Sequence, residues 1–262
     1  MARTLHLVAE QPDFVQLFGK NGQLVGMHPM PARQVISPGE PILTILHANQ
    51  RPVARLMKWA FLPDWVKDPG DFTSISSARM ETVEKKPSFR NAIRYRRCLV
   101  PATGVWQFPK RGAEACQTPQ LLTHPDGKLF AIAAIWETWM GPFGEEMDTV
   151  AILTAPAKGD LAKTCDRVPL VIRPADFDLW LDVLSGRFHE ARPLLQPVTR
   201  DKLWIKDLDR MMQEQTKGQS QTKGTARSPE EDRIPLPGEL GSDDEETVKG
   251  GKRGKPRQLK LF

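Results

Sequence analysis

Few residues of this chain have side chains that could do chemistry alone, and they are widely separated. The three cysteines, Cys98, Cys116 and Cys165, are odd in number and form no CxxC pair, which favours reduced thiols in a cytoplasmic protein over a disulfide framework. The five histidines show no metal-ligand spacing, so no metal and no cofactor are predicted. Arginines are more informative, because a guanidinium group can bind a phosphate through two parallel hydrogen bonds.

Composition limits the partners that these residues could serve. A net charge of +5 over 262 residues is mild, so it permits a polyanion such as DNA without requiring one. No run of about 18 apolar residues is present, so no membrane partner is expected. The N-terminus lacks the apolar stretch of a secretory signal. We expect a cytoplasmic protein, and a monomer.

The elements that must position these residues are mostly short strands. Two stretches, 86–96 and 174–184, are typical of helices, and the second begins with Pro174 and Asp176 as start signals. Strands without a regular βαβ alternation predict an α+β fold rather than a doubly wound sheet. The strand-like runs, separated by Pro- and Gly-rich turns, cover residues 3–8, 41–47, 97–108, 129–139, 149–156 and 168–172.

The chain divides into one domain and a tail. Residues 1–210 hold most of the aromatic residues and can form one domain. Residues 211–257 are rich in Gly, Pro, Ser and charge, so they cannot bury enough apolar surface to offset the ordering entropy and are expected to be a disordered linker. Its basic part, Lys249–Arg257, is either simply solvated or able to touch DNA phosphates.

Several segments, taken together and in order, resemble one family. They are SARMETVEKKPSFRNAIRYRRCLVPATGVWQF, DTVAILTAPA and CDRVPLVIRPADFDLWLD, with ARQVISPGEP and KWAFLPDW before them. In order and spacing they are similar to the SRAP family, the SOS-response-associated peptidases, which recognise abasic sites in single-stranded DNA. The resemblance covers roughly residues 1–185. It implies an open, curled β-barrel of mostly antiparallel strands with flanking helices.

The resemblance also implies a particular chemistry. In the family, an N-terminal cysteine traps a ring-opened abasic site as a thiazolidine, with an Asn, a Glu and a His around it. This chain departs at all four positions, which are Ala2, Ser77, Gln107 and Cys165. Without a thiol at residue 2 no thiazolidine can form, and Gln107 cannot accept or return a proton at neutral pH. We therefore expect the stable cross-link to be lost, as in a pseudoenzyme.

The residues that bind DNA in the family are largely retained. Arg79 and Arg167 match arginines that lie by the DNA backbone, and Trp65 matches a tryptophan that stacks on bases. Pro38 lies in the turn that wedges beside those bases. Arg3 matches an N-terminal arginine if one residue is missing here.

Each of these positions also has a purely structural interpretation, and the alternatives stay open. Cys165 is either a small buried hydrophobe or a reactive thiol. Arg79 could pair with a carboxylate such as Glu81, Trp65 could pack in the core, and Ser77 and Gln107 could be hydrogen-bonding groups without a ligand.

Three functions follow from these alternatives. The first is a protein of the DNA damage response that binds single-stranded or abasic-site DNA without forming the stable cross-link. The second is an enzyme in which the Ala2 α-amine forms an imine with the abasic aldehyde, which then hydrolyses or cleaves the strand. The third is an adaptor that does not bind DNA.

The end of the chain, QLKLF, resembles the short peptide by which bacterial replication and repair proteins dock on the DNA sliding clamp. Gln258 and Leu259 would supply the amide and the aliphatic residue of that peptide, and Leu261 and Phe262 would fill an apolar pocket. The bacterial sliding clamp is therefore a possible partner through residues 258–262. The alternatives are a chain that simply ends in apolar residues and a tail that folds back on its own domain.

Overall fold

The architecture is known from a computed structural model, which describes residues 4–49, 51–107, 119–124, 126–159, 161–195 and 204–206. Ala2, Arg3 and Cys116 lie outside these residues, and so do the predicted linker 211–257 and the predicted clamp-binding peptide 258–262. No helix in the described part of the chain is long and apolar enough to cross a membrane.

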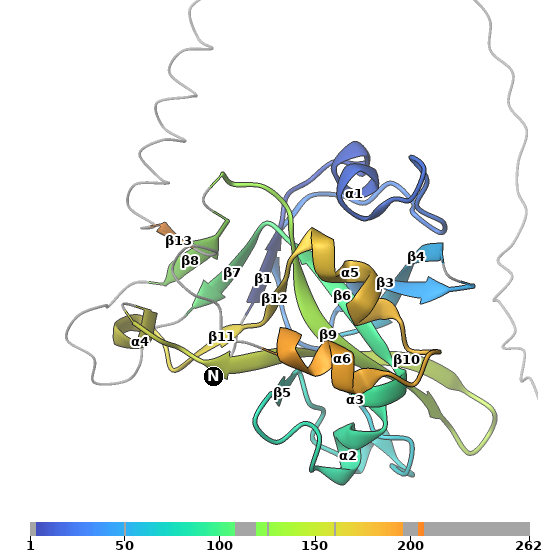
Figure 1. Cartoon of the computed structure of the whole chain (residues 1–262). Coiled ribbons are helices and arrows are strands. Elements are labelled where there is room, and N and C mark those ends of the chain that lie inside the picture. The colour runs from blue at the N-terminus through green and yellow to red at the C-terminus, as the bar shows by residue number, and fades with distance from the viewer. Residues whose placement is uncertain are drawn as a thin grey trace, which may run out of the picture. The chain divides into compact units, whose positions relative to one another are not determined.

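The centre of the molecule is a barrel of five strands (Figure 1). Hydrogen bonding runs β10–β4–β3–β6–β9 and returns from β9 to β10, and every pair is antiparallel except β10–β4. The predicted α+β fold with a curled barrel of mostly antiparallel strands is confirmed, and this ring is closed rather than open. The strands are β3 (Pro41–Ala48), β4 (Arg51–Lys58), β6 (Arg97–Ala102), β9 (Phe130–Met140) and β10 (Glu146–Pro156).

A second, antiparallel sheet of five strands has the order β13–β8–β7–β1–β2. The apolar run 97–108, expected as one strand, is divided at Thr103, whose backbone N–H donates to the His6 carbonyl at 2.9 Å. As a result β6 belongs to the barrel and the segment after it belongs to the second sheet. The strands are β1 (Thr4–Leu7), β2 (Arg33–Ile36), β7 (Gly104–Gln107), β8 (Gln120–Thr123) and β13 (Trp204–Lys206).

Short strands and helices surround the barrel. β5 (Ser77–Arg79) and β11 (Arg167–Pro169) pair with β10, and β12 (Val171–Ile172) pairs with β9. Both predicted helices are present but interrupted, the first as α2 and α3 and the second as a 3-10 turn, η2, followed by α5. The helical elements are α1 (Gln11–Phe18), α2 (Pro87–Arg90), α3 (Ala92–Tyr95), α4 (Leu161–Thr164), α5 (Phe177–Leu181), α6 (Phe188–Ala191), η1 (Pro69–Asp71), η2 (Pro174–Asp176) and η3 (Arg192–Leu194).

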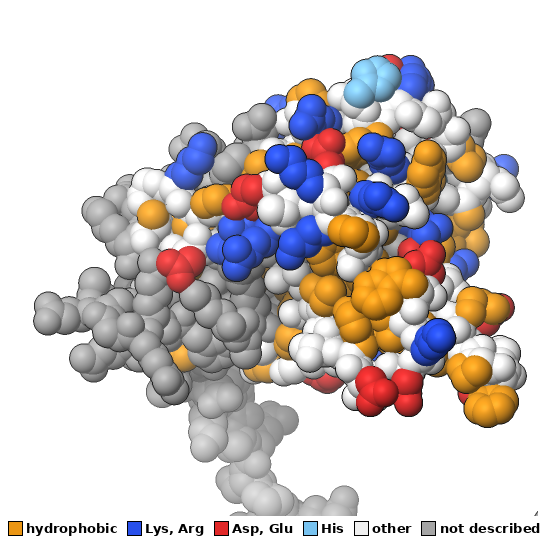
Figure 2. All heavy atoms as spheres, turned by 90° about the horizontal axis from the view of Figure 1, so that it is seen from below, with side chains coloured by type: hydrophobic (Ala, Val, Ile, Leu, Met, Phe, Trp, Pro, Cys, Tyr) orange, Lys and Arg blue, Asp and Glu red, His pale blue; other side chains and the backbone are white. Residues whose placement is uncertain are grey.

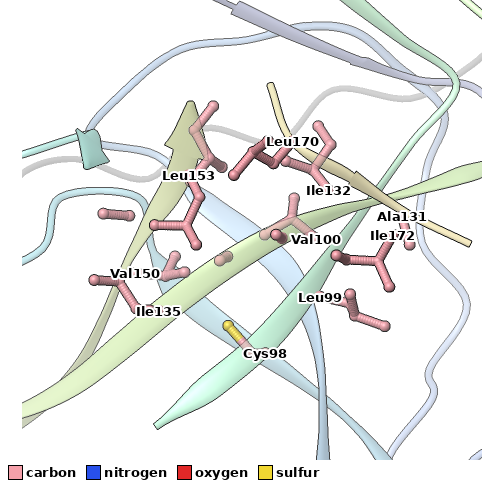
Figure 3. Close-up of a cluster of buried hydrophobic side chains, with 14 of the residues drawn as sticks. Cys98, Leu99, Val100, Ala131, Ile132, Ile135, Val150, Leu153, Leu170 and Ile172 are labelled. Carbon is pink, nitrogen blue, oxygen red and sulfur yellow. The ribbon is translucent and has the colours of Figure 1, made fainter. Parts of the chain in front are cut away.

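The barrel interior is filled by aliphatic side chains (Figure 3). β6, β9 and β10 supply most of them, and Ile132, Ile135 and Val150 are completely buried. Cys98 points into the same cluster, where burial raises the pKa of its thiol. This cysteine is therefore an inert packing residue, which is the ordinary role of a buried thiol.

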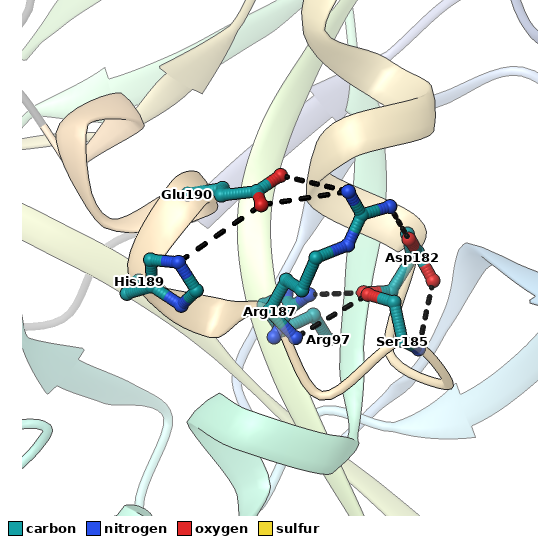
Figure 4. A network of polar contacts seen from close by, with 6 residues as sticks. All are labelled: Arg97, Asp182, Ser185, Arg187, His189 and Glu190. Carbon is teal, nitrogen blue, oxygen red and sulfur yellow. Dashed lines mark hydrogen bonds and ion pairs between the residues drawn. The ribbon is translucent and has the colours of Figure 1, made fainter.

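A buried arginine fastens the helices to the barrel (Figure 4). Arg97 opens β6, and its guanidinium group donates to the backbone carbonyls of Ile93, Arg94, Trp180 and Asp182. Figure 4 shows the contact with Asp182. Burial lowers the pKa of Arg97 to about 10, which leaves it charged at neutral pH. Since these carbonyls lie at the ends of α3 and α5, one side chain caps two helices.

Candidate functional site

A cleft of about 580 Å³ opens beside β10. β5 runs parallel to β10 with Arg79 opposite Thr154, and β11 runs antiparallel to it with Arg167 opposite Pro156. Because Thr154 also pairs with Pro169, β5 and β11 flank opposite edges of β10. Paired residues share a face of the sheet, as do residues two apart in a strand, so both arginines face the cleft. Its lining residues are Trp59, Ser76, Ser77, Arg79, Ile152, Thr154, Asp166 and Arg167.

The guanidinium group of Arg167 is held on both sides. It binds Glu81 through two hydrogen bonds, Nη1 to Oε1 at 2.8 Å and Nη2 to Oε2 at 2.7 Å. It also donates to Thr154, from Nε to Oγ1 at 3.1 Å and from Nη2 to the backbone carbonyl at 2.7 Å. The hydrogen bonds from Arg167 hold the pKa of Glu81 below its usual value, so this carboxylate is ionised at neutral pH.

Arg79 is arranged differently from Arg167. Its side chain is exposed and makes no hydrogen bond or ion pair with any residue that the structure describes. The carboxylate of Glu81, two residues along the chain, is bonded to Arg167 instead. The suggested Arg79–Glu81 pair is therefore not formed, and the charge of Arg79 faces the cleft unpaired.

Trp59 forms part of the wall of the cleft, and a neighbouring turn is attached to it. Trp59 is only 1% exposed, and its indole N–H donates to the Ser76 carbonyl at 2.7 Å. Pro38 is exposed in the turn before β3. This turn is fastened to Trp59 by the Gly39 N–H, which donates to the Trp59 carbonyl at 2.8 Å. The φ of Gly39 is +98°, a conformation that favours glycine.

Two of the positions expected at the site do not line this cleft. Cys165 belongs to the buried core, and its Sγ donates to the Leu161 carbonyl at 3.3 Å, as expected of a small buried hydrophobe. Gln107 ends β7 in the second sheet, is 6% exposed and has an Nε2 without a hydrogen-bond partner in the described structure. Ala2 and Arg3 lie outside the described residues, although Thr4 next to them pairs with Trp106 next to Gln107.

Trp65 lines a second cleft, of about 560 Å³. Its ring is 56% exposed and meets Phe72 edge to face, with the ring centroids 5.6 Å apart. Trp65 is therefore not a core residue. This second cleft is lined by Asp64, Trp65, Val66, Lys67, Asp68, Pro69, Trp139, Met140, Pro142, Phe143 and Glu145.

The motifs did not identify every residue of the first cleft. Thr154 lies within the apolar segment AILTAPA, where a threonine among buried residues is the available signal. Asp166 stands between Cys165 and Arg167 in the sequence, yet only the structure shows that it lines the cleft. No group of three or more His, Cys, Asp or Glu residues that could hold a metal occurs among the residues described.

Comparison with known proteins identifies the family. The family model described as SOS response associated peptidase (SRAP) matches residues 4–214. The chain belongs to the SRAP family. The cleft between β5 and β11 is therefore part of an SRAP domain.

SRAP relatives with curated names cover much of the chain. The abasic site processing protein YoqW of Bacillus subtilis is 28% identical over 168 residues, which are 64% of this chain and 75% of that protein. The abasic site processing protein YedK of Escherichia coli is 27% identical over 59% of this chain and 67% of its own length. The corresponding protein HMCES of Rattus norvegicus is 24% identical over 54% of this chain and 48% of its own.

Solved structures share the SRAP fold. A protein from Bordetella bronchiseptica superposes with a TM-score of 0.64 at 20% identity, covering 78% of this chain and 98% of its own. A protein from Bacteroides thetaiotaomicron gives a TM-score of 0.59 at 25% identity, covering 68% and 80%.

Proposed function

We propose that this protein acts in the DNA damage response by binding single-stranded DNA, abasic-site DNA in particular, in the cleft between β5 and β11. We further propose that it does so without forming a stable covalent link. The observation that carries the proposal is Arg79, an exposed guanidinium group that lines a 580 Å³ cleft and has no hydrogen bond or ion pair with the residues that the structure describes. An arginine in this state can bind a phosphate without first breaking another ion pair.

The surroundings of the cleft support a DNA partner. Figure 2 shows the face that lies lowest in Figure 1, near β5 and α2, where Lys and Arg side chains gather with a hydrophobic patch beside them. Basic groups contact the backbone and apolar rings contact bases, which is the usual combination for single-stranded nucleic acid. The preference for abasic DNA is proposed from the names of the SRAP relatives, which are abasic site processing proteins.

The side chains at the reaction positions support binding without the family's cross-link. Ala2 offers no thiol, and Ser77 replaces an amide by a hydroxyl. Gln107 carries an amide that does not titrate. The thiol of Cys165 is buried and donates to a carbonyl within its own helical turn. None of these groups supplies the proton transfer or the covalent trap that a stable adduct needs.

Further DNA contacts are proposed for residues around the cleft. Pro38 is exposed in the turn fastened to Trp59, so it can lie against a base next to the abasic position. Trp65 offers an exposed ring for stacking. Arg167 lines the cleft as its second guanidinium group, and Arg3 is a further candidate on the strength of its sequence position alone.

The test is a binding titration with abasic and intact single-stranded oligonucleotides at several salt concentrations. Arg79→Ala should weaken binding about fivefold at 0.1 M salt and reduce the salt slope by about 0.7, the effect of one phosphate contact. The matched control is Arg51→Ala, because Arg51 is also exposed and lies at the far end of β4, roughly 25 Å along the strand from Trp59. Equal binding by both variants and the native protein would contradict the proposal.

A parallel reaction with borohydride distinguishes binding from chemistry. Borohydride reduces an imine to a stable amine, so a covalent adduct with abasic DNA would show that the Ala2 α-amine still reacts. Absence of an adduct together with salt-dependent binding supports the non-covalent function. Absence of both leaves the adaptor function.

We also propose that Gln258–Phe262 is a tether to the bacterial sliding clamp. The support is the sequence QLKLF and the charged segment before it. If that segment is the disordered linker that its composition predicts, it would raise the effective concentration of the domain near DNA. Deleting the five residues should abolish clamp binding in a pull-down at tens of micromolar and leave the DNA affinity of the domain unchanged.

A further inference from the structure

We infer that Glu81 acts as an electrostatic brake in the first cleft, which means that its negative charge weakens DNA binding there. It neutralises Arg167, so the cleft binds phosphate mainly through Arg79. This inference rests on the proposed function and concerns the same cleft. It assigns to Glu81 a charge-balancing role.

The donors of Arg167 show how far its charge is already used. Of the five N–H groups in a guanidinium, two bind the Glu81 carboxylate and two bind Thr154. The paired arrangement with Glu81 is the fork-to-fork geometry that a phosphate would otherwise adopt. A phosphate can reach the same edge of Arg167 only by displacing Glu81.

The charges of the cleft and of its nearest ion pair balance one another. Arg79, Arg167 and Asp166 line the cleft, and Glu81, which does not line it, adds a second negative charge through its pair with Arg167. Only Arg79 has neither a hydrogen bond nor an ion pair within the described part of the protein. The native cleft is therefore close to neutral, and Arg79 is the guanidinium group in it that has no described ion-pair partner.

Removing the charge of Glu81 should not misplace Arg167. Thr154 still accepts hydrogen bonds from Nε and Nη2 of Arg167. Thr154 is itself held in place, because it is only 1% exposed and its hydroxyl lies 3.3 Å from the Ala78 carbonyl. The variant Glu81→Gln would thus keep the guanidinium group in position and remove the negative charge that neutralises it. The side chain of Gln has almost the same volume as Glu, so no cavity is created.

The experiment is a salt titration of single-stranded DNA binding with the full-length protein. Glu81→Gln is expected to raise the affinity about fivefold at 0.1 M salt and to increase the salt slope by about 0.7, as one added phosphate contact requires. In the double variant Glu81→Gln/Arg167→Ala this gain should vanish. Such dependence on Arg167 would not arise from a merely structural role of Glu81.

The matched control is Glu84→Gln. Glu84 also pairs with a distant arginine, Arg192, at 2.8 Å, and its substitution changes the net charge by the same amount without removing a partner of Arg167. Glu84→Gln should leave the affinity and the salt slope as in the native protein. An equal gain in affinity in both variants would mean that the gain comes from the change in net charge alone, which would overturn the inference.

The outcomes separate this inference from the proposed function. If the native protein does not bind but Glu81→Gln does, the brake is supported and the proposed function of the native chain is refuted. If the native protein binds through Arg79 and Glu81→Gln binds equally well or more weakly, the proposed function stands and the brake is refuted. If neither protein binds, both are refuted.

Discussion

The two clefts of this domain are similar in construction and opposite in surface chemistry. Their volumes are about 580 and 560 Å³. Each contains a buried tryptophan whose indole N–H donates to a backbone carbonyl, Trp59 to Ser76 at 2.7 Å and Trp139 to Val66 at 2.6 Å. The first cleft presents arginines. The second exposes aromatic and apolar side chains, with Phe143 91% exposed, beside the carboxylates of Asp64, Asp68 and Glu145.

The difference shows that the supporting tryptophan does not decide what a cleft can bind. The exposed side chains around it do, because charge at the rim selects the ligand. Arg79 attracts phosphate, whereas the three carboxylates of the second cleft repel it and its single lysine only partly offsets them. If a DNA strand crosses both clefts, it must contact the second one with its bases, and the phosphates must turn away from it.

The largest expected effect concerns the two buried tryptophans. Trp59→Ala and Trp139→Ala should each lower the free energy of unfolding by about 3–5 kcal/mol, since each leaves a large cavity. The measurement is urea unfolding of each variant. Trp59→Phe and Trp139→Phe are the controls, and should lose only about 1–3 kcal/mol for the unsatisfied carbonyl. A loss below about 1 kcal/mol for either alanine variant would show that the two clefts are not built alike.

Much of this comparison could not be read from the sequence. The α+β fold and the family followed from ordered motifs and strand-like runs. The three-residue strand β5 has too few residues for a periodic signal, and its parallel pairing with β10 joins segments about 75 residues apart. β4 was also missed, because Arg51, Arg55 and Lys58 interrupt its apolar residues. The sequence also could not identify the ion-pair partner of Glu81, because that pairing depends on the tertiary structure. Arg79 is nearest in sequence, but tertiary pairing brings Arg167 from 86 residues away.

The next effect concerns the exposed ring of the second cleft. If Trp65 stacks on a base, Trp65→Ala should weaken single-stranded DNA binding by about 1–3 kcal/mol without changing the salt slope, because stacking neutralises no phosphate. Arg79→Ala should instead change the slope. Phe143→Ala is a suitable control, since Phe143 is exposed in the same cleft. A change of slope in Trp65→Ala would mean that phosphates do run along the second cleft.

A smaller effect is expected from the acidic rim. Asp64→Asn removes a negative charge beside Trp65 and should raise DNA affinity by no more than about fivefold at 0.1 M salt, provided that the strand crosses the second cleft. The same substitution should have no effect if DNA is confined to the first cleft. Binding titrations with short and long oligonucleotides distinguish these cases, because only the long strand can reach both clefts.

The smallest effect is a difference in the sign of pH dependence between two glutamates. Hydrogen bonds from Arg167 lower the pKa of Glu81 at the first cleft, whereas burial raises the pKa of Glu137 on β9, despite its hydrogen bond to Arg96. Glu81 therefore contributes stability that is present above its unfolded pKa and is lost as the pH falls through its folded pKa. Glu137 contributes stability that is present below its unfolded pKa and is lost as the pH rises through its folded pKa.

Since Gln does not titrate, the stability difference between native protein and Glu81→Gln should grow as the pH rises through the range where carboxyl groups titrate. The difference for Glu137→Gln should shrink over the same range. Both differences come from urea unfolding at a series of pH values, and slopes of the same sign would refute the assignment of at least one environment. Because the Glu81 side chain is 41% exposed, solvent screening should make its slope the shallower of the two.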